Sequence, residues 1–338
     1  MSMRWYVARR LLWAAFATFV VLSGYFVLLQ IAPGDGRAQF AFEAATSGGN
    51  VSQAQETFDQ IRGLQGSLGE RYVDYMTNMA TGDWGWSFTR NRPVIAAMAD
   101  AYPYSLQYAL PATFLAIVFG YGIGLYSATH QYTLSDYFGT FVAFFGISIP
   151  NFWFGIMLIL IFAVQAFDLV LFGVQLLPLP SFYQTGVVQE HGWISWENAR
   201  QLILPVVVLT TGSVAGNMRY SRAEALEYVH AEFVKTARAK GAGGWRILLR
   251  HILRPAAVPL MTIFIADLLG LLFAGAYLTE VIFQIPGLAL LSFNAIINQD
   301  TPLVMGTTLI PVLLVVIGNL IQDIAYTLLD PRIDYGDR

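Results

Sequence analysis

Few residues of this chain have the types and spacing that catalysis requires. A phosphate-binding loop ends in Gly-Lys, whereas the two lysines, Lys235 and Lys240, follow Val234 and Ala239. The four histidines lack the His-Glu-x-x-His spacing of a zinc protease, and the sequence has neither a Gly-x-Ser-x-Gly elbow nor a cysteine. We therefore expect no catalytic residue, no metal site and no cofactor in this chain. The functions that remain are movement of a substrate across a membrane and anchoring of a partner.

The composition indicates that most of the chain lies in lipid. Its 338 residues are 56% hydrophobic and only 12% charged, whereas soluble domains carry about 25% charged residues. The 24 Phe, 17 Tyr and 8 Trp would make exposure to water still less favourable. The formal net charge of -3 is too small to suggest a nucleic-acid partner. These values exclude an ordinary soluble enzyme.

Long uncharged stretches predict an all-α polytopic membrane protein with six transmembrane helices. About 20 apolar residues suffice for one helix to cross a bilayer. The first stretch, between Arg10 and Asp35, is too long for the apolar region of a secretory signal, so we interpret it as an uncleaved anchor. The other five predicted spans are 101–135, 137–167, 202–218, 255–279 and 301–322.

Two other stretches of low charge are poor candidates for spans. Residues 169–189 are interrupted by Pro178 and Pro180, which favours an interfacial or re-entrant loop. Residues 281–299 contain several Gln and Asn residues, which do not suit lipid, so we expect this segment at the outer surface.

Positive charge predicts the orientation. Arg4, Arg9 and Arg10 precede the first span, eight Lys and Arg residues lie between spans four and five, and Arg332 and Arg338 follow the last span. Because such flanking charges stay in the cytoplasm, we expect a protein of the cytoplasmic membrane with both termini on its cytoplasmic side. Residues 1–33 would form the N-terminal tail and first helix, and 34–100 an extracytoplasmic cap. Residues 101–338 would form a core with a cytoplasmic loop at 219–255.

The loop at 219–255 combines eight positive charges with apolar residues at spacings of mostly three or four. This pattern predicts an amphipathic helical pair, and glycines at 241, 243 and 244 predict a turn between two short helices. The loop either sets topology alone or presents an apolar face to a membrane surface or a partner's groove. The apolar residues are Phe233, Ala237, Trp245, Leu248 and Ile252.

This loop resembles the cytoplasmic coupling motif of ATP-binding-cassette importer permeases, in the dipeptide, oligopeptide and nickel branch. Shorter matching segments lie in the expected order at 82–87, 148–153, 283–287 and 329–333. The sequence departs from the family pattern in three places. Residues 235–237 read Lys-Thr-Ala instead of Glu-Ala-Ala, which is usual for this branch. The turn between spans two and three has no Lys or Arg, and an acid, Asp267, stands where an uncharged residue is expected. The resemblance assigns ATPase coupling to Glu232, Phe233, Lys235, Thr236, Ala237, Arg238, Ala239, Lys240, Gly241 and Ala242.

The resemblance implies a pore-forming transport subunit that is not itself an enzyme. Its expected partners are a second, similar permease, two ATPase subunits that carry ATP and Mg, and an extracytoplasmic substrate-binding protein. The segment 232–249 would dock its apolar face into a groove on the ATPase. The expected cargo is a peptide, with oligosaccharides as the second candidate and nickel as the third. An ion-coupled secondary transporter is the competing interpretation, although no internal repeat is visible.

Two acids and two glycines in or directly after the predicted spans are further candidates. Because a charge facing lipid costs about 2.5 to 3.5 kcal/mol, Asp267 should face the bundle interior or a water-filled path, as a substrate-path residue or a structural acid. Glu280, at the outer end of span five, is expected to contact the binding protein or the partner permease. Gly120 and Gly124 form a Gly-x-x-x-Gly pair, which indicates either close helix packing or ordinary small-residue content.

Overall fold

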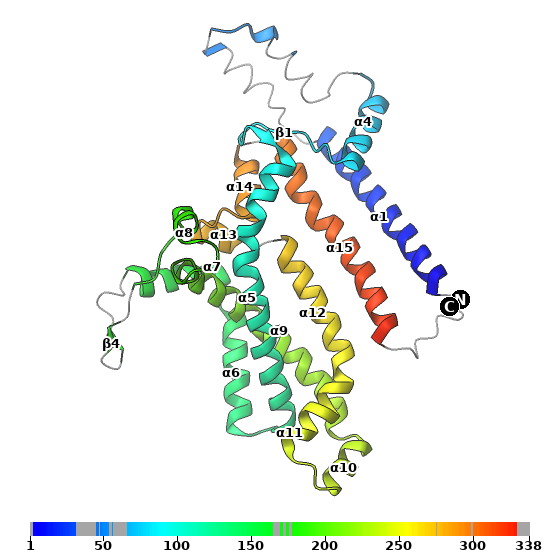
Figure 1. Ribbon diagram of the computed structural model, residues 1–338, viewed down its shortest axis with the longest axis vertical. Helices are drawn as coiled ribbons and strands as arrows, with labels where there is room; N and C mark the ends of the chain where they lie inside the picture. The colour runs from blue at the N-terminus through cyan, green and yellow to red at the C-terminus, as the bar shows by residue number, and fades with distance from the viewer. Residues whose placement is uncertain are drawn as a thin grey trace.

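The computed structural model describes residues 3–31, 45–46, 48–53, 56, 66–164, 170–171, 174–175, 178–274, 276–298 and 300–329. These residues are almost entirely helical (Figure 1). Two short antiparallel hairpins pair β1 (Trp86–Ser87) with β2 (Arg92–Pro93), and β3 (Val170–Leu171) with β4 (Val174–Gln175). The helices are α1 (Met3–Ile31), α4 (Leu68–Thr81), α5 (Val94–Thr129), α6 (Leu134–Ser148), α7 (Asn151–Ile159), η1 (Leu160–Val164), α8 (Thr185–His191), α9 (Trp196–Val229), α10 (Glu232–Ala239), α11 (Gly244–Arg246), η2 (Ile247–Leu253), α12 (Arg254–Ala274), α13 (Tyr277–Phe283), α14 (Leu288–Ile297) and α15 (Thr301–Leu329).

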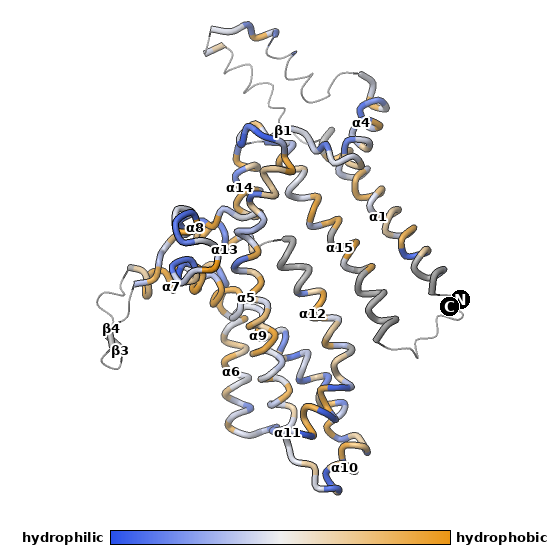
Figure 2. The backbone as a smooth tube through the Cα atoms, viewed as in Figure 1, coloured by the Kyte–Doolittle hydropathy of each residue, from blue (hydrophilic) through white to orange (hydrophobic). Residues whose placement is uncertain are grey.

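Four helical segments are long and apolar enough to cross a membrane: 8–28 in α1, all of α5, all of α9 and 301–318 in α15. Three bent helix pairs pass the same test, so the described residues hold between four and seven candidate spans. Figure 2 shows apolar residues along much of these helices. The finding confirms a helical, polytopic membrane protein, and the predicted six spans lie within its range.

The third predicted span, 137–167, is wrong as one continuous helix. It is divided into α6 and α7, which are bent by 95° at Ile149 and Pro150. A proline disfavours helical backbone in the residue before it, and Ile149 is accordingly extended, with φ -94° and ψ 125°. Because Pro150 then caps the new helix α7, the stretch changes direction there, although its lack of charge gives no sign of a break.

Helices α5 and α9 pack closely along the centre of the molecule, and the Gly120/Gly124 pair lies in their contact. A Cβ atom on Gly120 would come within 2.5 Å of Asn217 Cβ, and one on Gly124 would overlap Ser221 Oγ and the Met218 carbonyl oxygen. Ser221 Oγ also donates to the Gly120 carbonyl oxygen at 3.3 Å. Of the two interpretations, the packing role of the glycine pair is confirmed.

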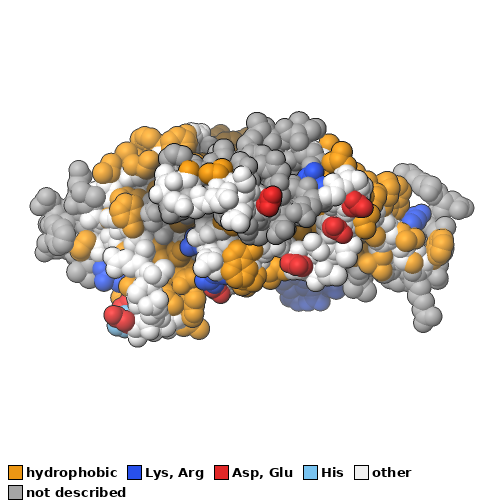
Figure 3. Space-filling model, turned by 90° about the horizontal axis from the view of Figure 1, so that it is seen from above, with side chains coloured by type: hydrophobic (Ala, Val, Ile, Leu, Met, Phe, Trp, Pro, Cys, Tyr) orange, Lys and Arg blue, Asp and Glu red, His pale blue; other side chains and the backbone are white. Residues whose placement is uncertain are grey.

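The two ends of the molecule are built differently. At one end, α4, the β1–β2 hairpin and α14 gather around the start of α15, whereas α10 and α11 lie at the opposite end (Figure 1). Asp300 joins the hairpin to α15, because its Oδ2 accepts from Ser87 Oγ at 2.7 Å and from the Thr89 N–H at 2.9 Å. Viewed from the α4 end, charged side chains of both signs are scattered among apolar and polar ones (Figure 3).

Candidate functional site

Helix α10 carries most of the predicted coupling residues, and a tight turn ends it. Gly241 has φ +79°, the left-handed conformation that glycine adopts at little cost. The Gly241 N–H donates to the Arg238 carbonyl at 2.9 Å, and the Ala242 N–H donates to the Ala237 carbonyl at 3.0 Å. These two bonds form the Schellman arrangement that commonly ends a helix at glycine. The predicted short helix and turn are therefore present.

The apolar face predicted for this segment is divided between the interior and the surface. Val234 is fully buried in a cluster with residues of α5, α9 and η2, and Ala237 is nearly buried. Phe233 and Trp245, in contrast, are 47% and 72% exposed. The expected docking of this apolar face into an ATPase groove stays a prediction, and only its exposed residues remain available for a partner because the fold itself buries the others. Leu248 and Ile252 are buried in the same cluster.

The polar coupling residues lie on the exposed side of α10. Lys235 Nζ forms an ion pair with Glu232 Oε1 at 2.6 Å, one helical turn away, and both side chains are largely exposed. Such a surface pair contributes little to stability. The exposed side therefore offers charges of both signs to a partner. Its other members are Phe233, Thr236, Arg238, Ala239, Lys240 and Gly241, while Ala242 is partly buried.

The second expected short helix is instead the beginning of a long one. Segments α11, η2 and α12 follow one another without interruption from Gly244 to Ala274, with a bend of 68° near Pro259. Helix α9 likewise continues to Val229, well beyond the predicted end of its span at 218. Because both neighbours of α10 are continuous with candidate spans, a displacement of α10 bears directly on α9 and α12.

A groove of about 300 Å³ separates α11 from the end of α5. Tyr126 and His130 stack on one wall with their ring centres 4.2 Å apart. Sequence reasoning missed these two residues, because an i, i+4 aromatic pair inside an apolar helix carries no sign of facing another segment. The groove is lined by Tyr126, Thr129, His130, Arg238, Gly244, Trp245, Ile247 and Leu248.

A partly buried ion pair joins the first turn of α6 to α9. Asp136 is 3% exposed, and its Oδ2 accepts from Arg222 Nη2 at 3.2 Å and from the Tyr132 N–H at 2.9 Å. Its Oδ1 accepts from Ser127 Oγ and, more weakly, from Thr140 Oγ1. This turn has no Lys or Arg of its own, and the structure supplies the positive charge from α9. Sequence reasoning counted Arg222 only as an orientation signal and missed its partner.

Replacement of Arg222 by Met should destabilise the protein by about 2 to 4 kcal/mol. The substitution leaves the Asp136 carboxylate buried without its cation, although three other donors remain. The matched control is Arg219→Met, one turn earlier on α9 and exposed. Thermal unfolding of the detergent-solubilised protein measures both variants. Equal melting temperatures for the two variants would contradict a stabilising role for the pair.

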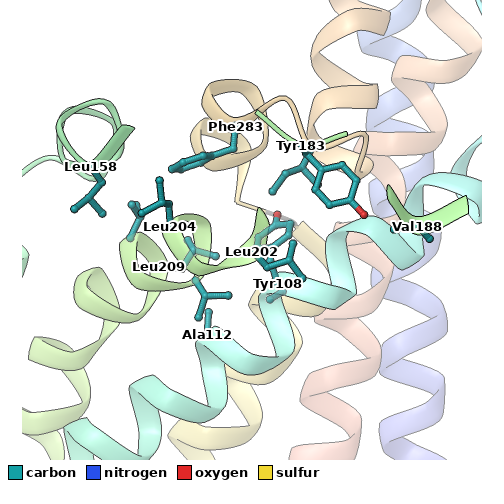
Figure 4. Packing of buried hydrophobic residues seen from close by; sticks show 13 residues of the cluster. Tyr108, Ala112, Leu158, Tyr183, Val188, Leu202, Leu204, Leu209 and Phe283 are labelled. Carbon is teal, nitrogen blue, oxygen red and sulfur yellow. The ribbon is translucent and has the colours of Figure 1, made fainter. Parts of the chain in front are cut away.

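Glu280 lies at the centre of a hydrogen-bond network between α5, α13 and α14. Its Oε1 accepts from Ser105 Oγ and from Tyr108 Oη, both at 2.7 Å, and its Oε2 accepts from the Leu290 N–H at 2.9 Å. Tyr108 belongs to a buried cluster in which Phe283 lies over the 202–209 stretch of α9 (Figure 4). The carboxylate thus joins the bent α13–α14 pair to the central helices.

The expected contact of Glu280 with a binding protein or partner permease is not supported by its position. The side chain has 0% exposure, and its described donors belong to this chain. A Cβ atom on Gly287 would overlap the Glu280 carboxylate, so the turn at Gly287 closes tightly over the acid. The acid is internal because α14 folds back over α13. The position of Glu280 at the end of an uncharged stretch did not indicate this packing.

Asp267 lies on α12, where it faces α5 and α9. Its carboxylate interacts with the Asn217 side chain of α9 and electrostatically with Tyr121 of α5. The Asp267 side chain is partly buried and Asn217 is 2% exposed. The acid therefore lies against neighbouring helices, close to the Gly120 contact between α5 and α9. Within the described residues, no cluster of three His, Cys, Asp or Glu side chains suits a metal ion.

The sequence also matches known proteins over the part of the chain that carries these residues. A family model described as the inner membrane component of binding-protein-dependent transport systems covers residues 120–335. The chain belongs to this family. The permease is 34% identical to the oligopeptide transport system permease protein AppB of Bacillus subtilis, over 98% of this chain and 99% of that protein. It is 33% identical to the di/tripeptide transport system permease protein DppB of Pseudomonas aeruginosa, over 97% and 98% of the two chains.

Membership fixes several properties of the permease. It is a multi-pass component of the inner membrane and a transport subunit, not an enzyme. A binding-protein-dependent system of the ABC class implies a separate binding protein and separate ATPase partners. The resemblance seen in the loop at 219–255 is confirmed at the level of the family. The matched range includes α10, the Arg222–Asp136 pair, Asp267 and Glu280.

Proposed function

We propose that the permease is a pore-forming subunit of an ATP-driven importer of di- or oligopeptides, working by alternating access. It would pair with a second, similar permease and with two ATPase subunits that bind ATP and Mg. Peptide cargo is supported by two relatives whose names specify oligopeptides and di/tripeptides. An oligosaccharide or nickel importer of the same branch is the second candidate for cargo.

The observation that carries this proposal is the placement of α10. On its buried side Val234 packs in a cluster with residues of α5, α9 and η2, while its exposed side presents Phe233 and several charges. An ATPase that binds the exposed side would therefore move the ends of three long helices together. The Schellman turn at Gly241 fixes the angle between α10 and α11.

The proposed orientation follows from the same helix. Arginines and lysines gather in α10, α11 and η2, and positive charge flanking a span stays in the cytoplasm. The α10 end of the molecule would then face the ATPases, and the α4 end would face the binding protein. Under this orientation both termini are cytoplasmic, and residues 34–100 contribute the extracytoplasmic cap.

The test of this function uses the complete transporter in proteoliposomes with its binding protein. Labelled tripeptides, oligosaccharides and nickel are offered separately, with and without ATP. We expect peptide to accumulate only with ATP and the binding protein. Accumulation of sugar or nickel alone would contradict peptide cargo, and uptake driven by an ion gradient without ATP would favour a secondary transporter.

Gly241→Val should uncouple transport while the permease remains inserted in the membrane. A β-branched residue at φ +79° costs roughly 1 to 2 kcal/mol, so the turn should open and α10 should change its angle. Space is not limiting, because a Cβ atom at Gly241 meets nothing within 4 Å. The measurement is peptide-stimulated ATP hydrolysis together with uptake, both expected to fall at least tenfold.

Two matched variants separate backbone conformation from bulk at this turn. Gly243→Val adds the same side chain at φ -68°, also in open space, and should leave coupling intact. Gly241→Asn should retain most activity, because asparagine tolerates the left-handed conformation. Normal coupling in Gly241→Val would remove the support for α10 as the coupling helix.

A further inference from the structure

Two acids within the helix bundle, Asp267 and Glu280, form no ion pair with a described residue, but Glu280 accepts three hydrogen bonds from described donors of its own chain. Asp267 forms no ion pair with any described Lys, Arg or His, in contrast to Asp136, which contacts Arg222. An acid within a membrane-spanning helix is unfavourable unless it faces a partner or water, and such residues commonly mark a substrate path. Because Asp267 has no such set of donors, its missing counter-charge indicates a cation that is supplied from outside the described chain.

The groups around Asp267 are hydrogen-bonding neutral side chains. Asn217 interacts with the carboxylate, yet its buried Nδ2 forms no hydrogen bond of normal geometry. Tyr121 Oη donates to the Leu260 carbonyl at 2.8 Å, which leaves its oxygen free to accept. The two carboxylate oxygens and the phenol oxygen are acceptors that suit a group with several N–H donors.

The chemistry of this site favours an organic ammonium over a metal ion. Within the described residues, Asp267 is not part of any group of three carboxylate or imidazole ligands. A single carboxylate with neutral oxygen neighbours is too sparse a set for a tightly bound divalent cation, which prefers six or more oxygen ligands or a set of nitrogen ligands. An ammonium group needs only a few acceptors and one negative charge.

We propose that Asp267, with Asn217 and Tyr121 beside it, forms a subsite for the ammonium group of a peptide passing through the permease. This inference rests on the proposed peptide function and names the part of the cargo that the membrane interior recognises. Asp267 contacts the cargo, and Asn217 positions the carboxylate. Because α12 follows α10 through α11 and η2, a movement of α10 would change the distance between Asp267 and its neighbours on α5 and α9.

The test compares two cargoes in one preparation of the complete transporter. Binding protein is preloaded with a tripeptide that has a free N-terminal amine, or with its des-amino analogue, and import per ATP hydrolysed is measured. The wild-type permease should import the free-amine peptide at least tenfold faster. In Asp267→Asn this preference should fall to about onefold, whereas Asp267→Glu should restore at least a third of it.

The outcomes separate the subsite from the function on which it rests. The readout is a ratio of two cargoes in the same preparation, so a variant that assembles in lower yield still gives an answer. An unchanged preference in Asp267→Asn, with peptide import intact, would overturn the ammonium subsite and leave the peptide function standing. Failure of the wild-type transporter to import either peptide would overturn both. Loss of import for both cargoes equally would assign Asp267 a structural role and overturn the subsite.

Discussion

Gly124→Leu is expected to prevent the permease from folding into a stable bundle. A Cβ atom at this position already overlaps Ser221 Oγ and the Met218 carbonyl oxygen, and it would lie 3.0 Å from the Arg222 backbone nitrogen. Since two of these three atoms belong to the α9 backbone, a change of rotamer cannot relieve the overlap. Overpacking of this kind costs about 3 kcal/mol or more, because the two helices must move apart.

The loss of stability in Gly124→Leu should extend beyond local packing. Separation of α5 and α9 would break the hydrogen bonds from Ser221 to the Gly120 carbonyl and from Thr210 to the Ala112 carbonyl, both at 3.3 Å. It would also displace Arg222 from Asp136. We expect little monodisperse protein on size-exclusion chromatography of detergent extracts, and no uptake in cells.

The same helix offers a matched control. Gly122→Leu adds an identical side chain two residues earlier, at a position where a Cβ atom meets nothing within 4 Å. This variant should be extracted and should elute like the wild type. If Gly124→Leu behaved like Gly122→Leu, the close approach of α5 and α9 in the structure would be wrong.

The amino-acid sequence predicts the membrane location and the coupling loop well, because both depend on local properties. Charge scarcity identifies lipid-facing helices, and a glycine after Arg238, Ala239 and Lys240 identifies the end of α10. Neither feature requires knowledge of which helices are neighbours. The family resemblance also depends on local strings, and the match over residues 120–335 confirms it.

The sequence does not predict features that depend on neighbouring helices. Val234 and Phe233 are both apolar and adjacent, yet one is buried against α5 and α9 and the other is exposed. Likewise, the carboxylates of Asp136 and Glu280 find their partners on segments far away in the chain. The bend at Pro150 had a local signal, but proline also occurs inside α5, at Pro103 and Pro111, where the helix continues. Only the packing around each proline distinguishes these cases.

Glu280→Ala is expected to be the most destabilising single loss of a side chain among the acids described here. Removal of the carboxylate leaves the Leu290 N–H and the hydroxyls of Ser105 and Tyr108 buried without an acceptor. Each unsatisfied buried donor costs about 1 to 3 kcal/mol, so a total of about 3 to 5 kcal/mol is expected. The α13–α14 pair should loosen from α5, where the bond from the Leu288 N–H to Ser105 Oγ at 2.9 Å would remain as a link.

Three variants distinguish the loss of this network from the loss of a charge. Glu190→Ala, on the surface helix α8, removes an acid that is 79% exposed and should leave the melting temperature unchanged. Glu280→Gln keeps one acceptor oxygen but turns an amide N–H₂ toward a donor, so its melting temperature should lie between those of the wild type and Glu280→Ala. Tyr108→Phe removes one donor and should cost about 1 to 2 kcal/mol, because Oε1 keeps Ser105 as its partner while the Ala276 N–H loses its acceptor. A Glu280→Ala protein as stable as Glu190→Ala would show that α13 and α14 are held by apolar contacts alone, since the network would then contribute nothing measurable.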